Sequence, residues 1–207
     1  MSTSVEMTDI FLEYPTESGK VAVLKNASLM VPPGETLAIT GPSGSGKSTI
    51  ARLLSPHIGV APGALIARSD AIRKRLYGLK DETERLPPEA YREPASIATY
   101  EEMERLCALA LTQGHSAIAD ATFTHPDSRL RIEAIARKAG VPFIGIWLDL
   151  DQATAAARVA GRTGDASDAT SRVVAQQFQN GWGEMTWKKI AATDPQEDQV
   201  AAILNSL

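Results

Sequence analysis

A glycine-rich stretch at residues 41–48, GPSGSGKS, combines residue types that bind phosphate. It fits the pattern of a glycine, four residues of any type and then Gly-Lys-Ser, which is typical of a phosphate-binding loop. Glycines let the backbone curl so that successive N–H groups face a phosphate, and the helix that follows directs the positive end of its dipole at the same point. The motif therefore predicts a site for a purine nucleoside triphosphate with Mg²⁺. The residues expected to contact the nucleotide are Gly41, Ser43, Gly44, Ser45, Gly46, Lys47, Ser48 and Thr49.

Two side chains of this loop have specific tasks in such a site. The Lys47 ammonium can reach the β- and γ-phosphates, and the Ser48 hydroxyl can ligate Mg²⁺. The context of the loop also fits, because the apolar stretch TLAIT before it reads as a strand and the stretch GKSTIARLLSPHI reads as a helix. A glycine-rich turn without a ligand would not require this context.

Asp120 is a second candidate metal ligand. It ends the apolar stretch SAIAD, which reads as a strand, and ligands of open α/β folds bind at the carboxyl ends of the strands. Its carboxylate can hold a water of Mg²⁺ or polarise the acceptor side, with Thr122 beside it. The alternative is an aspartate that merely ends a strand.

Two pairs of charged residues lie at helical spacing. Asp70 is expected to open a helix as its N-cap, with Arg73 three residues later on the same face. Arg158 and Arg162 lie four residues apart, near the end of a helix that leads into the polar stretch TGDASDAT. Without further information, Arg73 reads as a solvated partner of Asp70, and the two later arginines read as complements of a helix dipole.

The elements that must position these residues form a strand–helix alternation, which indicates a parallel sheet. Before the loop, the stretches VEMTDIFLEY and VAVLKNASLMV read as an antiparallel β-hairpin. We therefore expect a hairpin extension at residues 1–35 and a single nucleotide-binding domain at residues 36–207.

The remaining composition narrows the class of protein. The net charge of −4 excludes a global basic surface for nucleic acid, and no apolar run approaches the length of a membrane span. The N-terminus lacks the features of a signal peptide, so a cytoplasmic protein is expected. Cys107 reads as a buried thiol, Trp182 and Trp187 read as packing residues, and the histidines His57, His115 and His125 are too scattered for a metal site.

The first fifty residues resemble the opening of an ABC-transporter ATPase. The likeness is carried by LEYPTESGKVAVLKNASLMVPPGETLAITGPSGSGKST, and Tyr14 stands where that family places an aromatic residue that stacks on adenine. Beyond the loop the likeness ends, because the chain has no LSGGQ-like signature or glutamine loop, and AIAD is followed by Ala121 instead of a glutamate. A working transporter motor is therefore not expected.

From the loop onward, about three quarters of the chain resembles the small P-loop kinases grouped with polynucleotide kinase, zeta toxin and chloramphenicol phosphotransferase. It is most similar to the predicted kinase domain that bacteria fuse behind aminoglycoside-phosphotransferase-like domains. The resemblance implies a three-layer α/β/α P-loop fold with a parallel sheet in the order 2-3-1-4-5. The Asp120 strand then lies directly beside the loop strand, whereas an ABC ATPase has another strand between them. The segments that carry this likeness, in the order of the family, are ARSDAIRKRLYGL, AIADATF, PFIGIWLDLDQATAAARVAGR and GDASDAT.

The kinase resemblance also implies roles for individual residues. It makes Asp70 the general base at the acceptor and Arg73 a clamp on an anionic group. It places Arg158 and Arg162 at a lid whose arginines reach the transferred phosphate, and it implies acceptor binding for Arg129, which also reads as a surface arginine. Adenine would then contact the lid and the C-terminal loop near ATDPQED, a location that competes with Tyr14.

The sequence thus predicts a kinase that transfers the γ-phosphate of ATP to a hydroxyl. Small molecules such as an antibiotic, a sugar or a nucleotide sugar fit a D-x-x-R acceptor site, and so does a 5′-hydroxyl nucleic acid as a substrate. The alternative is a module that binds or hydrolyses ATP without a specific acceptor. A further hypothesis is a chimera, in which an ABC-type hairpin and a kinase body were joined at the shared loop. No feature indicates an oligomeric state.

Overall fold

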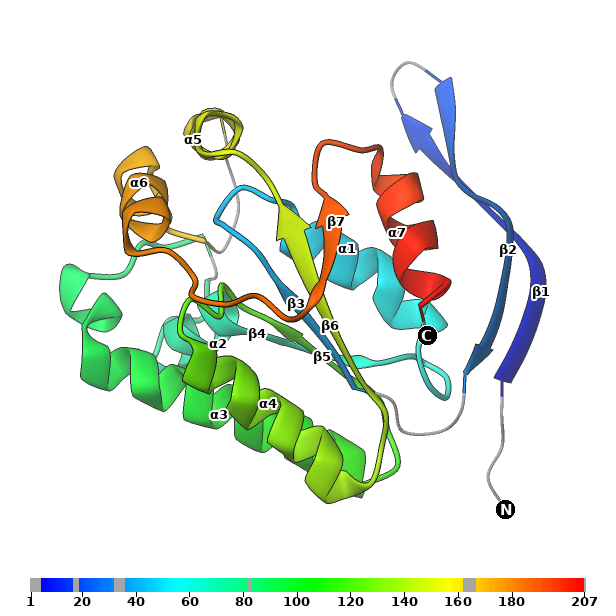
Figure 1. Ribbon diagram of the computed structural model, residues 1–207, viewed down its shortest axis with the longest axis horizontal. Coiled ribbons are helices and arrows are strands. Elements are labelled where there is room, and N and C mark those ends of the chain that lie inside the picture. Colours follow the sequence, from blue (N-terminus) through cyan, green and yellow to red (C-terminus); the bar gives the residue numbers. More distant parts are fainter. Residues whose placement is uncertain (1–4, 17–18, 32–35, 82, 162–166, 207) are drawn as a thin grey trace.

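The computed structural model describes residues 5–16, 19–31, 36–81, 83–161 and 167–206, with side chains from residue 36 onward (Figure 1). Its strands are β1 (Val5–Thr16), β2 (Gly19–Val31), β3 (Thr36–Thr40), β4 (Leu65–Arg68), β5 (Ala117–Asp120), β6 (Phe143–Asp149) and β7 (Lys188–Ala191). Its helices are α1 (Lys47–Leu54), α2 (Ser69–Leu76), α3 (Glu93–Thr112), α4 (Pro126–Ala139), α5 (Gln152–Ala160), α6 (Ser171–Asn180) and α7 (Gln196–Leu204), with short 3₁₀ helices at Ser55–His57 and Pro88–Tyr91.

Five strands form one parallel sheet in the order β4-β5-β3-β6-β7. With β3 counted as the first strand, this is the predicted order 2-3-1-4-5, which is confirmed. The strand β5 pairs directly with β3, in a register that sets Ile39 opposite Asp120. Every residue of β3 and β5 is buried, as expected for central strands covered on both faces.

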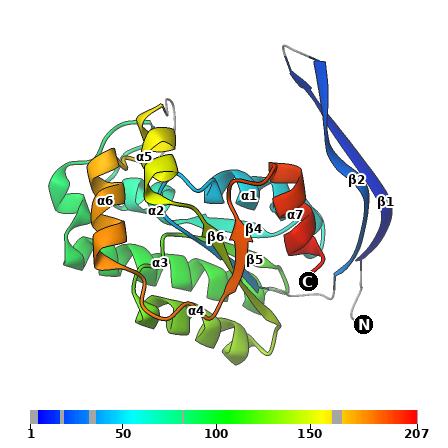
Figure 2. The same ribbon diagram turned by 45° about the horizontal axis from the view of Figure 1, so that its top comes forward.

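Helices cover both faces of this sheet and complete the predicted three layers (Figures 1 and 2). The helices α1 and α7 contact each other on one face, and α3 and α4 contact each other on the opposite face. Two apolar cores correspond to the two faces. One core contains Leu37, Ile39 and Leu54, and the other contains Met103 and Phe123.

The N-terminal hairpin is a separate two-stranded antiparallel sheet of β1 and β2, as predicted. It lies at the side of the domain next to α7 (Figures 1 and 2). Tyr14 belongs to β1, but its side chain lies outside the described part of the chain.

One helix start differs from the prediction. Helix α2 begins at Ser69 with Arg68 as its N-cap, so Asp70 lies in the first turn and is not the capping residue. The chain leaves β4 and enters the helix without an intervening loop, and this direct junction moves the helix start forward.

The expectations for Cys107, Trp182 and Trp187 agree with the structure. Cys107 is fully buried in α3, and burial raises the pKa of its thiol to about 12. Trp187 is buried and packs against Phe123 and Phe143, whereas Trp182 stacks edge-on against Trp147. Among the described residues, no group of His, Cys, Asp or Glu side chains could hold a metal ion by itself. No helix in the described segments is both long and apolar enough to cross a membrane.

Candidate nucleotide and phosphoryl-transfer site

The phosphate loop connects β3 to α1 and is shaped by glycines with positive φ. Gly44 and Gly46 have φ values of 92° and 91°, which favour glycine because a Cβ atom is strained there. A methyl group on Gly44 would lie 2.6 Å from the carbonyl oxygen of Ala155, so α5 packs closely over this part of the loop. Gly46 is the N-cap of α1, and Thr49 in the first turn donates its N–H to the Gly46 carbonyl.

Two features of the loop fit a bound phosphate. A Cβ atom built on Gly46 would have nothing within 4 Å, so there is open space beside the loop at the start of α1. The Ser45 hydroxyl is buried and has no hydrogen-bond partner among the described residues. An open cradle with a spare hydroxyl at a helix N-terminus matches the requirements of a phosphate group.

Lys47 lies inside the curl of the loop. Its Nζ donates to the carbonyl oxygens of Gly41 at 2.9 Å and Pro42 at 3.0 Å. The ammonium group is therefore held over the mouth of the loop, where a phosphate chain would accept from it.

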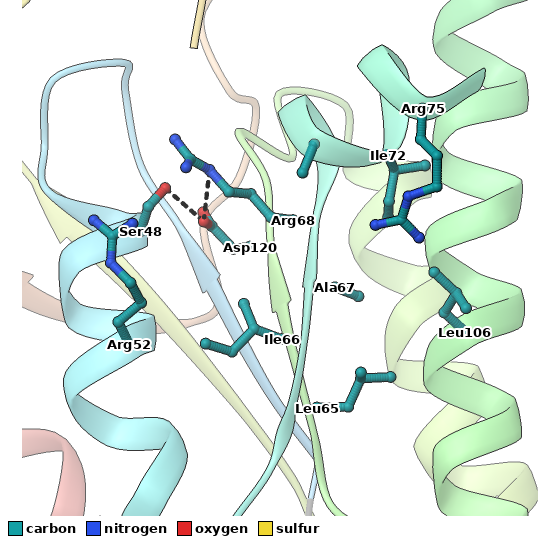
Figure 3. A pocket seen from close by; sticks show the side chains of 11 residues that line it. Ser48, Arg52, Leu65, Ile66, Ala67, Arg68, Ile72, Arg75, Leu106 and Asp120 are labelled. Carbon is teal, nitrogen blue, oxygen red and sulfur yellow. Dashed lines mark hydrogen bonds and ion pairs between the residues drawn. The ribbon is translucent and has the colours of Figure 1, made fainter. Parts of the chain in front are cut away.

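Ser48 and Asp120 meet at the carboxyl edge of the sheet (Figure 3). The Ser48 hydroxyl donates to Asp120 Oδ2 at 2.6 Å, and Arg68 Nε lies 3.7 Å from the same oxygen. The adjacency of β3 and β5 produces this contact, because α1 follows the loop strand and Asp120 ends its neighbour. A hydroxyl and a carboxylate oxygen are suitable ligands for Mg²⁺ or for its waters.

The charge state of Asp120 depends on its surroundings. Burial raises the pKa of its carboxyl, while the charge of Lys47, the hydrogen bond from Ser48 and the charge of Arg68 lower it. Its side chain is only 3% exposed. A cation placed between Ser48 and Asp120 would favour the ionised carboxylate further.

A pocket of about 260 Å³ opens beside the Ser48–Asp120 pair (Figure 3). Its floor is apolar, and three arginines from three different elements line it: Arg52 from α1, Arg68 from β4 and Arg75 from α2. Asp120 is the single acidic residue of the lining. The pocket therefore carries a positive charge next to the predicted metal site.

Asp70 and Arg73 lie on α2 but have different surroundings. Asp70 is half-buried in the first turn, close enough to Asp120 to raise the pKa of that carboxyl. Arg73 is buried, not solvated, and its guanidinium donates to the carbonyl of Ala90 and lies 5.0 Å from the centre of the Tyr91 ring. The kinase resemblance assigns the Arg73 guanidinium to binding an anionic group, and these contacts already use part of its hydrogen-bonding capacity.

The lid region is described in part. Arg158 Nη2 donates to the carbonyl oxygen of Ala192 at 3.0 Å, next to the loop that the resemblance assigns to adenine. Arg162 lies outside the described residues.

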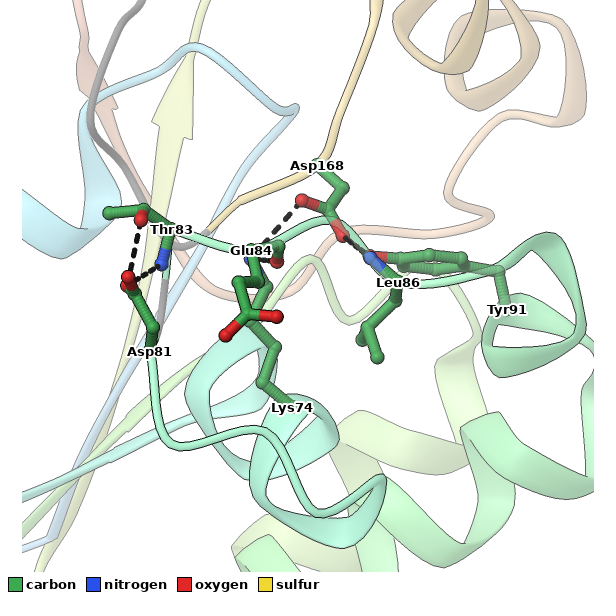
Figure 4. Close-up of polar contacts among 7 residues, drawn as sticks. All are labelled: Lys74, Asp81, Thr83, Glu84, Leu86, Tyr91 and Asp168. Carbon is green, nitrogen blue, oxygen red and sulfur yellow. Dashed lines mark hydrogen bonds and ion pairs between the residues drawn. The ribbon is translucent and has the colours of Figure 1, made fainter.

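Asp168, from the predicted lid stretch, connects this region to α2 and to the segment that follows it (Figure 4). It accepts hydrogen bonds from Lys74 Nζ at 3.2 Å, the Leu86 N–H at 2.9 Å and the Tyr91 hydroxyl at 2.6 Å. The Lys74 side chain is 1% exposed and also donates to the Glu84 carbonyl. Burial acts to raise the pKa of Asp168, but these hydrogen bonds and the Lys74 charge outweigh it, so the pKa lies below its usual value.

Arg129 is a structural residue in this arrangement. Its guanidinium is buried and donates to the carbonyl oxygens of Phe123, Trp182 and Glu184, which excludes the interpretation as a surface arginine. These bonds hold the segment after β5, where Phe123 has a φ of 40° that is unusual for a residue with a side chain. The Thr122 carbonyl in that segment accepts from the Thr40 hydroxyl of the loop strand at 2.7 Å.

Sequence reasoning missed three residues of the site: Arg68, Lys74 and Gln177. Arg68 ends β4 just as Asp120 ends β5, and the strand pairing β4–β5 would have placed them side by side. Lys74 and Gln177 carry no local signal, because their partners Asp168 and Ser43 are 94 and 134 residues away in sequence.

Short segments of ABC-transporter proteins are similar to this chain. A stretch of 50 residues is 46% identical to the macrolide export ATP-binding/permease protein MacB of Chromobacterium violaceum, which is 24% of this chain and 8% of that protein. A stretch of 61 residues is 46% identical to the ABC multidrug transporter atrC of Emericella nidulans, which is 30% of this chain and 5% of that protein. These matches fit the ABC-like segment, and they span too little of either relative to transfer its activity.

Solved structures of kinases share the fold. A putative kinase from Chloroflexus aurantiacus aligns with a TM-score of 0.62 at 14% identity, over 84% of this chain and 98% of that one. The Mycobacterium tuberculosis APS kinase CysC in complex with AMPPNP and APS gives 0.56 at 17% identity, over 84% and 96%. A gluconokinase from Sinorhizobium meliloti gives 0.53 at 19% identity, over 84% and 93%. At these identities the likeness supports the fold of a P-loop kinase.

The family comparison covers the elements that build the site. The model of the AAA domain family, AAA_33, matches residues 37–180, from β3 to the end of α6. Because this match spans more than half of the 207 residues, the chain belongs to the AAA_33 family of AAA domains.

Proposed function

We propose that this chain is an ATP-dependent kinase that transfers the γ-phosphate of ATP to a hydroxyl of an acceptor. The contact between Ser48 and Asp120 is the observation that carries the proposal, because it joins the phosphate loop to the neighbouring strand end with the ligand types that Mg²⁺ prefers. The parallel sheet of kinase order positions this contact.

Each residue of the site would have its own role in phosphoryl transfer. Lys47 and the loop N–H groups would hold the phosphates in place, and Ser48 with Asp120 would hold Mg²⁺, which neutralises charge on the phosphates. Asp70 would take the proton of the acceptor hydroxyl as its oxygen bonds to the γ-phosphorus and ADP leaves. Arg158 and Arg162 would supply guanidinium groups from the lid.

The arginines beside the site favour an acceptor with an anionic group. Arg52, Arg68 and Arg75 line the same pocket as Asp120, and its apolar floor would accept carbon atoms of the acceptor. A sugar acid, a sugar phosphate and a 5′-hydroxyl oligonucleotide all meet this description, and nucleic acid would act only as a substrate. A neutral sugar would gain nothing from these charges.

The test is ADP release from Mg·ATP with each of these four acceptor classes. We expect an anionic acceptor to stimulate release, Asp70→Asn to lower the stimulated rate by about 10²- to 10⁴-fold while ATP still binds, and Lys47→Ala to lower ATP binding itself. Asp81→Asn, which changes an exposed aspartate of the loop after α2, is the matched control. Stimulation that is unaffected by Asp70→Asn would contradict the assigned base, and ATP binding without stimulation by any acceptor would contradict the kinase proposal.

A second candidate is a module that binds or slowly hydrolyses ATP without an acceptor. The observation in its favour is Arg73, whose guanidinium bonds to the Ala90 carbonyl and faces the Tyr91 ring, away from the role of an anion clamp. In that case ADP release is expected to be the same with and without every acceptor, and to be lost in Lys47→Ala.

The hairpin at residues 1–35 and the domain at residues 36–207 remain our division of the chain, and we propose that they derive from two P-loop lineages. The short ABC-type matches and the family match over residues 37–180 support this origin. A set of natural relatives that carry the same hairpin on the same domain would contradict a recent fusion.

A further inference from the structure

Gln177 connects α6 to the phosphate loop by two hydrogen bonds. Its Oε1 accepts from the Ser43 N–H at 3.0 Å, and its Nε2 donates to the Ser43 hydroxyl at 3.1 Å. The carboxamide thus holds both the main chain and the side chain of one loop residue. Ser43 is only 8% exposed, so this contact is part of the packed structure.

Helix α5 reinforces this connection from the other end of the lid. Its Ala155 carbonyl and Val159 side chain would lie 2.6 Å and 3.1 Å from a Cβ atom on Gly44, the residue next to Ser43. The helices α5 and α6 also pack against each other. The two helices that flank the predicted lid therefore rest on neighbouring residues of the loop, α6 on Ser43 and α5 on Gly44.

The position of Ser43 relative to Lys47 indicates which part of a bound nucleotide lies near Gln177. Lys47 Nζ donates to the Pro42 carbonyl at 3.0 Å, and Pro42 directly precedes Ser43. In a loop of this type the lysine serves the β- and γ-phosphates. The Gln177 carboxamide thus bonds to the residue directly after Pro42, whose carbonyl oxygen accepts from Lys47.

We propose that Gln177 is a positioning residue that sets the phosphate loop for a triphosphate and holds the lid helices in register with it. The inference deepens the proposed ATP-dependent function of the same site. By taking the Ser43 N–H, Gln177 fixes the curvature of the loop so that the following N–H groups face inward. A neutral amide is suited to this place, because a carboxylate would repel the γ-phosphate.

The test compares Gln177→Glu, Gln177→Ala and the control Gln176→Ala by titration with ATP and with ADP in the absence of any acceptor. Glutamate can keep both hydrogen bonds, because the Ser43 hydroxyl can rotate to donate, so it isolates the effect of charge. We expect Gln177→Glu to weaken ATP binding about tenfold more than ADP binding, since one added negative charge acts on one further phosphate charge. Gln177→Ala is expected to weaken ATP binding about tenfold and to reduce the preference for ATP over ADP.

The control changes an exposed glutamine of the same helix and is expected to leave both affinities unchanged. The melting temperature of each variant shows whether it folds. Gln177→Met, which keeps the length of the side chain but neither hydrogen bond, keeps the inference testable if Gln177→Ala does not fold. Equal changes in ATP and ADP affinity, or values like those of Gln176→Ala, would overturn the inference.

Kinase activity is a separate readout. If the ATP preference falls in Gln177→Ala but no acceptor stimulates the wild-type chain, the kinase proposal fails and the role of Gln177 stands. If acceptors stimulate turnover but Gln177→Ala binds ATP and ADP as the wild type does, the kinase proposal stands and the role of Gln177 fails. A wild-type chain that binds neither nucleotide would overturn both.

Discussion

Asp168→Asn is expected to lower the free energy of unfolding strongly, although it alters no atom of the apolar core. Asp168 accepts three hydrogen bonds, and its partner Lys74 is a cation whose side chain is 1% exposed. Removing one partner of a buried ion pair costs about 3–5 kcal/mol, because the other charge stays buried without compensation. We expect about 3 kcal/mol, the lower end, since the asparagine oxygen can keep one donor and the Glu84 carbonyl still accepts from Lys74.

Urea unfolding measures this loss. The indole rings of Trp147 and Trp187 are almost fully buried, so tryptophan fluorescence follows the loss of the packed state. With a slope of about 2 kcal/mol per molar urea for a chain of this size, the midpoint should fall by about 1.5 M. The slope itself should not change.

Two comparisons separate the ion pair from a general effect of the substitution. Lys74→Met combined with Asp168→Asn removes both charges, so the double variant should be more stable than the sum of the two single losses by about 1 kcal/mol or more. Asp81→Asn, whose carboxylate accepts from Thr83 at the surface, should stay within about 0.5 kcal/mol of the wild type. A loss below about 1 kcal/mol in Asp168→Asn, or strict additivity in the double variant, would refute the reasoning.

Three further predictions rest on other groups. The stability difference between the wild type and Asp168→Asn should be full above about pH 5 and should shrink as the pH falls below about 4. The reason is that a carboxyl with a lowered pKa in the folded state contributes stability above its unfolded pKa and loses this contribution on protonation. Urea titrations from pH 7 to pH 3 measure this difference. Gly46→Ala should lower nucleotide affinity at least tenfold but cost only about 1–2 kcal/mol of stability. Gly44→Ala should cost more stability, because its methyl group would collide with the Ala155 carbonyl oxygen. Nucleotide titration and urea unfolding of both variants distinguish the two effects. Cys107 should resist thiol reagents at pH 8 in the folded chain and react in urea, since burial raises the pKa of its thiol to about 12; unfolding-dependent labelling checks this.

The elements of the domain could be predicted because their signals are local. The glycine motif is read within eight residues, and the alternation of strands and helices after it indicates a parallel sheet. The strand order followed from the family resemblance, and the pairing of β5 with β3 confirms it. The start of α2 was misjudged, because a capping preference for aspartate is weaker than the constraint of entering the helix directly from β4.

The site could be predicted only where its residues belong to a motif or to a strand end. Ser48 was predicted as a metal ligand from the loop pattern and Asp120 from the end of an apolar stretch, and the structure brings their side-chain oxygens to 2.6 Å. The environment of Arg73 could not be predicted, because it depends on the path of the segment that carries Ala90 and Tyr91, and that segment has no periodic pattern. The role of Gln177 could not be predicted either, because nothing in the sequence distinguishes it from its neighbour Gln176.

The contacts of Asp168 and Gln177 together make α6 a connection between helix α2 and the phosphate loop. Asp168 stands just before α6 and is bonded to Lys74 on α2, the helix of the proposed base Asp70. Gln177 stands within α6 and is bonded to Ser43 of the phosphate loop. The proposed acceptor side and the predicted nucleotide side of the site are therefore connected through Asp168 and the ten residues of α6 that follow it closely. Because phosphoryl transfer requires the acceptor oxygen and the γ-phosphate to be in line, a rigid connection of this kind would stabilise the required geometry without any contact to either reactant.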